Sequence, residues 1–151
     1  MKYWLMKTEP EAFSIDDLQK RGTESWDGVR SYQARNNMMA MKLGDRAFFY
    51  HSSTDVIGIA GVCEIVREAY PDHTAFDPES KYFDPASSQD KPRWYMVDVG
   101  FVEKFSRIVT LSEIRETPGL ENMFVTRRGA RLSVQPVTPE EWEIILGVAH
   151  R

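Results

Sequence analysis

The chain has 151 residues, a length that suits one domain with a hydrophobic core of its own. Its formal net charge of −4 at pH 7 excludes a protein that attracts nucleic acid through its overall charge, so any such contact has to come from a local basic patch. The single cysteine, Cys63, excludes an intrachain disulfide and a zinc site built on paired cysteines.

The start of the chain carries the signals of a strand and a helix. Tyr3–Met6 is a short apolar run that predicts a strand ending near Pro10. Ser14 followed three residues later by Asp17 is a capping signal, because each can bond the backbone of the other. It predicts a short helix over Ile15–Lys20.

The next elements are a helix and two strands. Ser31 as a cap and Gly44 as a terminator predict a helix over Tyr32–Met41. Aromatic residues predict a strand over Ala47–His51. A longer β-type run covers Ile57–Val66, and its two glycines indicate a bend or a close approach of another backbone.

The segment from Tyr70 to Pro92 differs from the rest of the chain. It holds four prolines and five Asp or Glu without an apolar period, which predicts a long irregular loop. Its aromatic residues favour a loop that packs against the domain. After it, Arg93–Phe105 is the clearest strand, and the alternation places one set of apolar side chains on one face: Tyr95, Val97, Val99, Phe101 and Phe105.

The last third predicts two helices and a short strand. Capping boxes precede Leu111–Arg115 and Glu140–Leu146, and a basic segment leads into a strand over Leu132–Val134. The capping pairs are Thr110 with Glu113 and Thr138 with Glu141. Short strands with small helices between them predict an α+β fold around a strongly bent sheet or barrel.

Catalytic signatures are missing from the sequence. We find no nucleophile elbow, phosphate-binding loop, zinc-protease motif or paired-cysteine motif. His51 ends an aromatic strand and is a candidate base, but no nucleophile and orienting group can be assigned to it from spacing. A structural or ligand-contacting role is favoured for His51. We therefore expect no catalytic residue, no metal and no cofactor.

The segment "WDGVRSYQARN", residues 26–36, is the best candidate for a binding site. The Asp-Gly pair predicts a turn that presents Trp26 and the start of the next helix, whose free amides attract anions. Trp26 beside these amides and Arg30 suits a planar, polar ligand that can carry a phosphate. The alternative is that Trp26 anchors the core while Arg30 and Arg35 are solvated, and the residues alone weigh the two about evenly.

The charge distribution permits a basic face. Residues 20–46 hold six Lys or Arg against three Asp or Glu, and Arg127, Arg128 and Arg131 add to them, while residues 64–90 hold seven acidic residues against two basic. Such a face would give salt-sensitive contact with nucleic acid. Ordinary surface charge is the alternative.

Eight segments, taken together and in order, resemble the EVE domain family. They are "YWLMKTEP", "SIDDL", "WDGVRSYQARNN", "GDRAFFYHS", "GIAGVCEIVREAYPD", "FDPES", "PRWYMVDVGFV" and "RLSVQPVTPEEW". The resemblance runs from Lys2 to about Ile145. It implies a single PUA-like domain over residues 1–151, a bent, partly closed β-barrel flanked by short helices. The same superfamily includes YTH domains, which hold methylated adenine in an aromatic cage, and EVE domains are similarly thought to bind modified bases in DNA or RNA.

The resemblance also implies a set of ligand-contacting residues. The Trp of "WDGVR" is similar in position to a YTH cage Trp, and Ser31 stands where the family has Asn, which keeps a helix cap but loses an amide. The expected contacts are Lys7, Trp26, Gly28, Val29, Arg30, Tyr32, Asn36, His51, Ser52, Trp94, Arg131, Ser133 and Gln135. If Trp26 lines such a pocket, we expect the fold to survive its removal.

The sequence thus predicts a binding module that recognises a modified nucleobase in DNA or RNA through an aromatic-lined pocket. One alternative is a small-molecule or nucleotide-binding protein or enzyme that uses the same pocket, where an anionic buffer molecule could also bind. Another is a protein-interaction module with a vestigial pocket. No apolar stretch is long enough for a signal peptide or a membrane span, so we expect a cytoplasmic protein that does not bind membranes.

Overall fold

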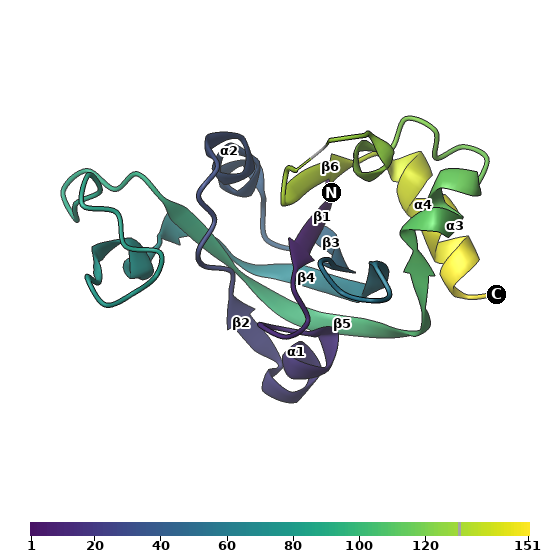
Figure 1. The fold of residues 1–151 in the computed structure, drawn as a ribbon, viewed down its shortest axis with the longest axis horizontal. Helices are drawn as coiled ribbons and strands as arrows, with labels where there is room; N and C mark the ends of the chain where they lie inside the picture. Colours follow the sequence, from purple (N-terminus) through teal and green to yellow (C-terminus); the bar gives the residue numbers. More distant parts are fainter. Residues whose placement is uncertain (130) are drawn as a thin grey trace.

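The computed structural model, which describes residues 1–129 and 131–151, contains one mixed sheet of six strands in the order β2-β5-β4-β3-β1-β6. The strands are β1 (Tyr3–Thr8), β2 (Thr23–Ser25), β3 (Arg46–His51), β4 (Gly58–Pro71), β5 (Tyr95–Thr110) and β6 (Val134–Val137). The helices are α1 (Ile15–Arg21), α2 (Tyr32–Ala40), α3 (Leu111–Glu116) and α4 (Pro139–Ala149), with short 3-10 turns η1 (His73–Phe76) and η2 (Phe124–Thr126). Figure 1 shows α3 and α4 at one end and the chain between β4 and β5 reaching out at the other.

The α+β class and the bent sheet are therefore confirmed. The sheet bends without closing, because β2 and β6 remain its two edges. β2 has only three residues and was not expected from the sequence. The last strand begins at Val134, where the predicted strand over 132–134 ends, so that prediction is displaced by two residues.

The bend is concentrated in β4 and β5, the two longest strands. Their pairing shifts register at four places, and each shift kinks the ladder and increases its twist. The glycines of β4 allow the two backbones to approach closely: a Cβ at Gly58 would lie 2.2 Å from the Val109 carbonyl oxygen, and one at Gly61 would lie 2.2 Å from that of Glu103. The close backbone approach predicted from these glycines is confirmed.

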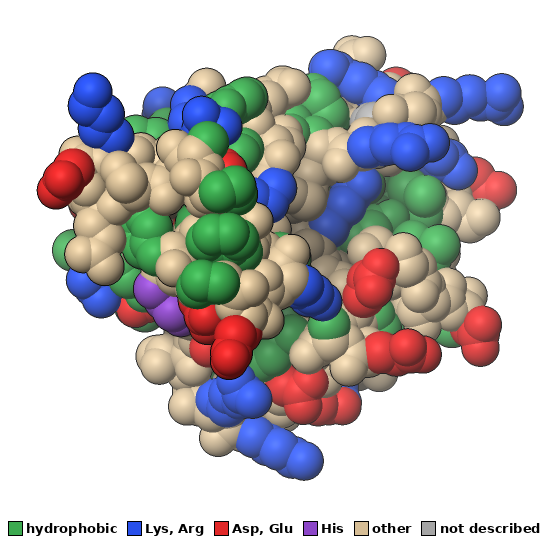
Figure 2. Space-filling model, turned by 60° about the vertical axis from the view of Figure 1, so that its left-hand side comes forward, with side chains coloured by type: hydrophobic (Ala, Val, Ile, Leu, Met, Phe, Trp, Pro, Cys, Tyr) green, Lys and Arg blue, Asp and Glu red, His purple; other side chains and the backbone are tan. Residues whose placement is uncertain are grey.

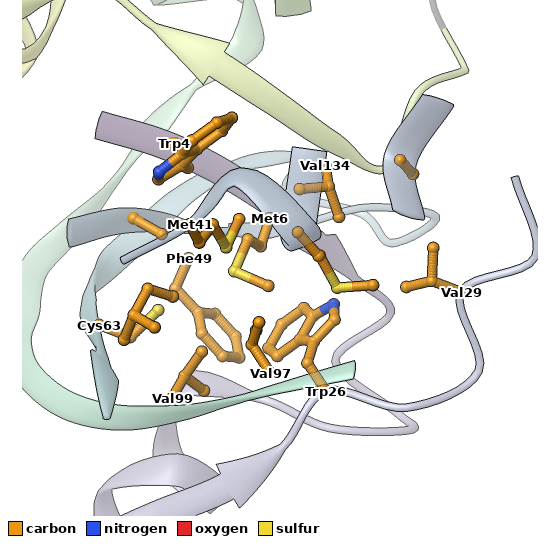
Figure 3. Close-up of a cluster of buried hydrophobic side chains, with 14 of the residues drawn as sticks. Trp4, Met6, Trp26, Val29, Met41, Phe49, Cys63, Val97, Val99 and Val134 are labelled. Atoms are coloured by element: carbon orange, nitrogen blue, oxygen red, sulfur yellow. The ribbon is translucent and has the colours of Figure 1, made fainter. Parts of the chain in front are cut away.

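Two hydrophobic clusters cover the faces of the sheet. Phe49 and Trp26 belong to the first cluster, part of which Figure 3 shows, whereas the neighbouring Phe48 belongs to the second. β5 contributes to both: Val97 lies in the first cluster and Phe105 in the second. The predicted single apolar face of this strand is wrong, because an extra residue at a bulge turns the following side chains to the other face.

Strand pairing brings three chain segments together at one end of the sheet, where β1 and β3 terminate. β1 and β3 are parallel, with Thr8 opposite His51, so both strands terminate at the same end of the sheet. β6 runs antiparallel to β1, and the backbone N–H of Lys7 donates to the Ser133 carbonyl just before β6 begins. The end of β1, the end of β3 and the start of β6 therefore meet although they are far apart in the sequence.

The segment between β4 and β5 packs against the domain at Tyr82, whose ring lies on Gly28, as its aromatic residues predicted, and polar contacts hold its base. The backbone N–H of Asp72 donates to the Trp94 carbonyl across its base, and the Trp94 indole donates to the Asp84 carboxylate at 2.7 Å. In the part of the chain that the structure describes, no helix is both long and apolar enough to cross a membrane.

Candidate functional site

A pocket of about 820 Å³ opens at the end of the sheet where the end of β1, the end of β3 and the start of β6 meet. The turn after β2 forms a second wall, the segment around α1 a third, and two residues of the β4–β5 segment a fourth. Its lining residues are Lys7, Thr8, Glu9, Ala12, Phe13, Arg21, Glu24, Ser25, Trp26, Asp27, Gly28, Val29, Arg30, Ser52, Lys81, Tyr82, Arg131 and Ser133. The pocket therefore depends on tertiary structure and not on one motif.

Arg30 connects two of these walls. Its guanidinium donates twice to the Tyr82 carbonyl, at 3.0 and 2.8 Å, and once to the Asp72 carboxylate at 3.1 Å. Asp72 is fully buried and also accepts from the Gly28 backbone N–H at 2.8 Å. Burial acts to raise the pKa of Asp72, but hydrogen bonds from Thr74, Gly28 and Arg30 outweigh it and hold that pKa below its usual range. This charged pair holds the β4–β5 segment against the turn after β2.

Gly28 lets the Tyr82 ring lie directly on the turn. Its φ of +79° is a left-handed conformation that side chains rarely adopt. A Cβ at this position would lie 2.6 Å from the ring carbons of Tyr82. Arg30 also lies beside this ring, with its guanidinium carbon 5.5 Å from the ring centre. The turn and the Tyr82 ring thus form one continuous wall.

Trp26 belongs to both the core and the pocket. Its side chain lies in the first hydrophobic cluster, where it meets the Phe49 ring edge-on at 5.5 Å and 88°, and only 7% of the residue is exposed. Figure 3 shows Trp26 with Phe49, Val97 and Val29 in this cluster. Trp26 is therefore a core residue that also forms part of the pocket wall, and its contact with a ligand stays a prediction.

The pocket is lined by more cations than anions. Five Lys or Arg and three Asp or Glu contribute to it. Figure 2 shows Lys and Arg side chains gathered around a hollow in one face of the molecule. Arg21 pairs with Glu24, whereas among the described residues Lys81 and Arg131 form no ion pair. Burial, and then the charge of Asp72, raise the pKa of Asp27.

Eight of the expected ligand contacts line this pocket, and five do not. Those that line it are Lys7, Trp26, Gly28, Val29, Arg30, Ser52, Arg131 and Ser133. Tyr32, Asn36, His51, Trp94 and Gln135 are absent from its wall. Of the arginines expected to form a basic face, Arg35, Arg127 and Arg128 are also outside the lining.

Most of the expected contacts that do not line the pocket interact with other residues of the protein. Gln135 is buried and donates its amide to the Leu132 carbonyl at 2.8 Å. Trp94 stacks on Tyr32 with their ring centres 4.9 Å apart, and the Arg30 guanidinium carbon lies 5.4 Å from the centre of the Trp94 ring. Asn36 is exposed on α2 and accepts from the Arg35 guanidinium.

His51 acts as a structural acceptor at the start of α1. Its Nε2 accepts the backbone N–H of Ile15 at 3.2 Å, and its ring meets Phe49 edge-on. Since Nε2 accepts, the proton of the neutral ring is on Nδ1. Burial lowers the pKa of His51 below its ordinary value of 6.5. The contacts of the His51 ring with Ile15 and Phe49 therefore give it a structural role.

Replacing His51 with glutamine should reduce the loss of stability on acidification. Because the pKa is lowered in the folded state, the unfolded chain takes up a proton that the folded chain does not, and stability falls as the pH drops below 6.5. One such group contributes at most about 1.4 kcal/mol per pH unit. Urea unfolding between pH 7 and pH 5 measures the slope. The exposed His73, changed to glutamine, is the control; an equal effect at both positions would contradict this role for His51.

Ten lining residues are not among the expected contacts, and Phe13, Asp27, Lys81 and Tyr82 are four of them. Phe13 precedes α1 and Asp27 lies inside the motif already singled out, so proximity to the motifs could have suggested both. Lys81 and Tyr82 come from the long segment, whose register no local pattern reveals.

Among the described residues, no group of three or more His, Cys, Asp or Glu could hold a metal ion. Burial raises the pKa of the Cys63 thiol to about 12, which keeps it protonated.

Comparisons with known proteins agree on one group of relatives. The family model described as EVE domain matches residues 2–148. Thymocyte nuclear protein 1 from Homo sapiens is 47% identical over 168 residues, which cover 99% of this chain and 74% of that protein.

Two solved structures extend the similarity to the whole fold. A crystal structure of a Pseudomonas syringae protein superposes with a TM-score of 0.95 at 49% identity, covering 97% of this chain and 99% of that one. The crystal structure of the human THYN1 protein in complex with DNA containing 5-methylcytosine has a TM-score of 0.92 at 46% identity, covering 100% of this chain and 99% of that one.

Proposed function

This chain belongs to the EVE domain family, and from that premise we propose that it binds a modified base of DNA, of the 5-methylcytosine type, in the pocket described above. The observation that carries the proposal is the human relative solved with DNA containing 5-methylcytosine, which matches this chain over 100% of its length with a TM-score of 0.92. A fold this similar at 46% identity supports the same class of ligand.

The lining of the pocket supports a base as the ligand. Tyr82 offers a partly exposed aromatic ring at the wall, and stacking of a base on such a ring contributes about 1–3 kcal/mol. Val29 and Phe13 provide apolar surface, where an additional methyl group contributes roughly 0.8 kcal/mol. Ser52 and Ser133 bring hydroxyl groups, and these suit the polar edge of a base.

The cations around the pocket support a ligand that is part of a nucleic acid. Lys81 and Arg131 line the pocket, are exposed, and form no ion pair among the described residues. Such side chains suit the phosphates on either side of a base. A base in a duplex has to leave the stack first, at a cost of a few kcal/mol, which phosphate contacts and the pocket together offset.

The proposal describes a binding domain without catalysis. His51 is bonded within the fold and the Cys63 thiol is buried, so neither presents a reactive atom to the pocket. DNA is proposed ahead of RNA because the relative solved with nucleic acid holds DNA. The organisation as one domain over residues 1–151 and the cytoplasmic location expected from the sequence are parts of the same proposal.

Titration with matched oligonucleotides tests the function. Duplexes and single strands that differ only at one position, carrying cytosine, 5-methylcytosine or thymine, are compared as DNA and as RNA. We expect 5-methylcytosine DNA to bind about fourfold more tightly than unmodified DNA, since one buried methyl group contributes roughly 0.8 kcal/mol. Equal affinity for cytosine and 5-methylcytosine in every context would refute the proposed function.

Binding should also weaken as salt rises. The logarithm of the affinity is expected to fall with a slope of about −0.9 per phosphate contact against the logarithm of the salt concentration. Replacing Arg131 with glutamine should reduce this slope by about one contact. Arg46, at the opposite end of β3, serves as the matched control, and its change to glutamine should leave the slope unaltered. An affinity independent of salt would instead indicate a small neutral ligand.

A further inference from the structure

The four tryptophans differ in what their indole N–H groups do. Trp4 donates to the Asp45 carboxylate at 3.1 Å and Trp94 to that of Asp84 at 2.7 Å. Trp26 and Trp142 have no hydrogen-bond acceptor for this group among the described residues. Of these two, only Trp26 lines the pocket.

The N–H of Trp26 has no acceptor although the residue is 93% buried, with 7% of its surface exposed. Buried tryptophans usually find a partner for this group, since an unpaired donor removed from water is costly. Within the described residues, no side-chain nitrogen or oxygen is both fully buried and unpartnered. The Trp26 Nε1 atom is therefore not fully buried, and Trp26 is one of the residues that line the pocket.

Most of the surface of the same side chain is buried in the core. The Phe49 ring meets it at 88°, and Trp26 is part of the cluster that contains Val29 and Val97. An aromatic side chain that serves as a stacking platform contributes a broad open face, and the exposed 7% of Trp26 does not provide one. Tyr82 and Phe13, which also line the pocket, are both less buried than Trp26.

We propose that Trp26 recognises the ligand by donating its indole N–H to an acceptor on the base, a carbonyl oxygen or an unprotonated ring nitrogen, and does not act as a stacking platform. The inference rests on the function proposed above and specifies the chemistry of that site. Cytosine carries adjacent acceptors, O2 and N3, on its pairing edge, whereas the ring nitrogen N3 of thymine carries a hydrogen. A donor that bonds N3 therefore favours cytosine over thymine, whereas a bond to a carbonyl oxygen is open to both bases.

An isosteric replacement tests the donor directly. Benzothienylalanine at position 26 keeps the shape and apolar surface of the ring while sulfur replaces the N–H. We expect its affinity for an oligonucleotide carrying 5-methylcytosine to fall about tenfold with little change in thermal unfolding, because a buried acceptor loses its partner. The same replacement at Trp142, whose N–H is also unpartnered but outside the pocket, is the matched control and should leave the affinity unchanged.

A measurement on the unmodified protein gives an independent test. The indole proton of Trp26 should exchange faster with solvent than those of Trp4 and Trp94 in the free protein, and adding the oligonucleotide should protect it. Unchanged exchange at Trp26, together with unchanged affinity of the benzothienyl variant, would overturn the inference while the wild type still prefers 5-methylcytosine. A wild type without that preference would overturn the proposed function, and the inference with it.

Discussion

Replacing Trp26 with alanine should lower the free energy of unfolding by about 3–5 kcal/mol, the range for removing a large ring from a packed core. The reason is that only 7% of the residue is exposed and its ring packs on Phe49. The expectation from the sequence that folding survives this change is therefore revised. Urea unfolding at neutral pH measures the loss, which corresponds to a fall in Tm of about 10 °C or more.

The matched control for this variant is Tyr32 changed to alanine. Tyr32 is also aromatic and lies six residues further on, but it is 53% exposed and outside the pocket wall. Its loss should cost about 1.5 kcal/mol or less, the value of an aromatic contact at the surface. Equal losses for Trp26 and Tyr32 would contradict the role of Trp26 in the core.

Replacing Arg30 with methionine should destabilise the protein by about 3 kcal/mol and abolish most of its affinity for modified DNA. The change keeps the apolar stem but leaves the buried carboxylate of Asp72 without its cation and the Tyr82 carbonyl without its two donors. Tyr82 and Lys81 would then lose their fixed place in the pocket wall. Unfolding in urea and titration with 5-methylcytosine DNA measure the two effects.

Two further variants separate the geometry of Arg30 from its charge. Arg30 changed to lysine keeps the charge but cannot reach the Tyr82 carbonyl and Asp72 together, so most of the loss should persist. Arg35 changed to methionine removes an arginine of the same segment that donates to the Arg93 carbonyl and is absent from the pocket lining. If the Arg35 variant were as weak as the Arg30 variant, general charge would explain binding, and the connection between the walls would not.

Local signals allowed most of the fold to be predicted. The box of Ser14 and Asp17 begins α1 as expected, and Thr138 with Glu141 begins α4, because these hydrogen bonds form within one turn. The box expected at Thr110 is only half present. Thr110 accepts from the backbone of Glu113, but the Glu113 carboxylate pairs with Arg107, which no local pattern reveals.

Features that depend on distant contacts were not predictable. The three residues of β2 form a strand only because β5 is there to pair with them. The bulges between β4 and β5 transfer Phe105 to the second cluster, although its spacing places it with Val97. An alternating pattern states which residues share a face only while the register is unbroken.

The candidate site was predictable where a motif carries it. Lys7, Trp26 and Ser133 lie in segments singled out from the sequence, and strand pairing brings them to the pocket wall. His51 and Gln135 lie in equally distinctive segments, yet the first accepts a bond from α1 and the second bonds back to Leu132. Tyr82 comes from a segment without periodicity, so its place over Gly28 is visible only in three dimensions.

The most direct measurement of the central claim is the crystal structure of this protein with a short DNA duplex that carries one 5-methylcytosine. We expect the modified base to be turned out of the duplex into the pocket, with its ring against Tyr82, an acceptor atom within hydrogen-bond distance of Trp26 Nε1, and phosphates beside Lys81 and Arg131. A modified base that stays stacked in the duplex, or DNA bound on another surface with the pocket empty, would contradict the account.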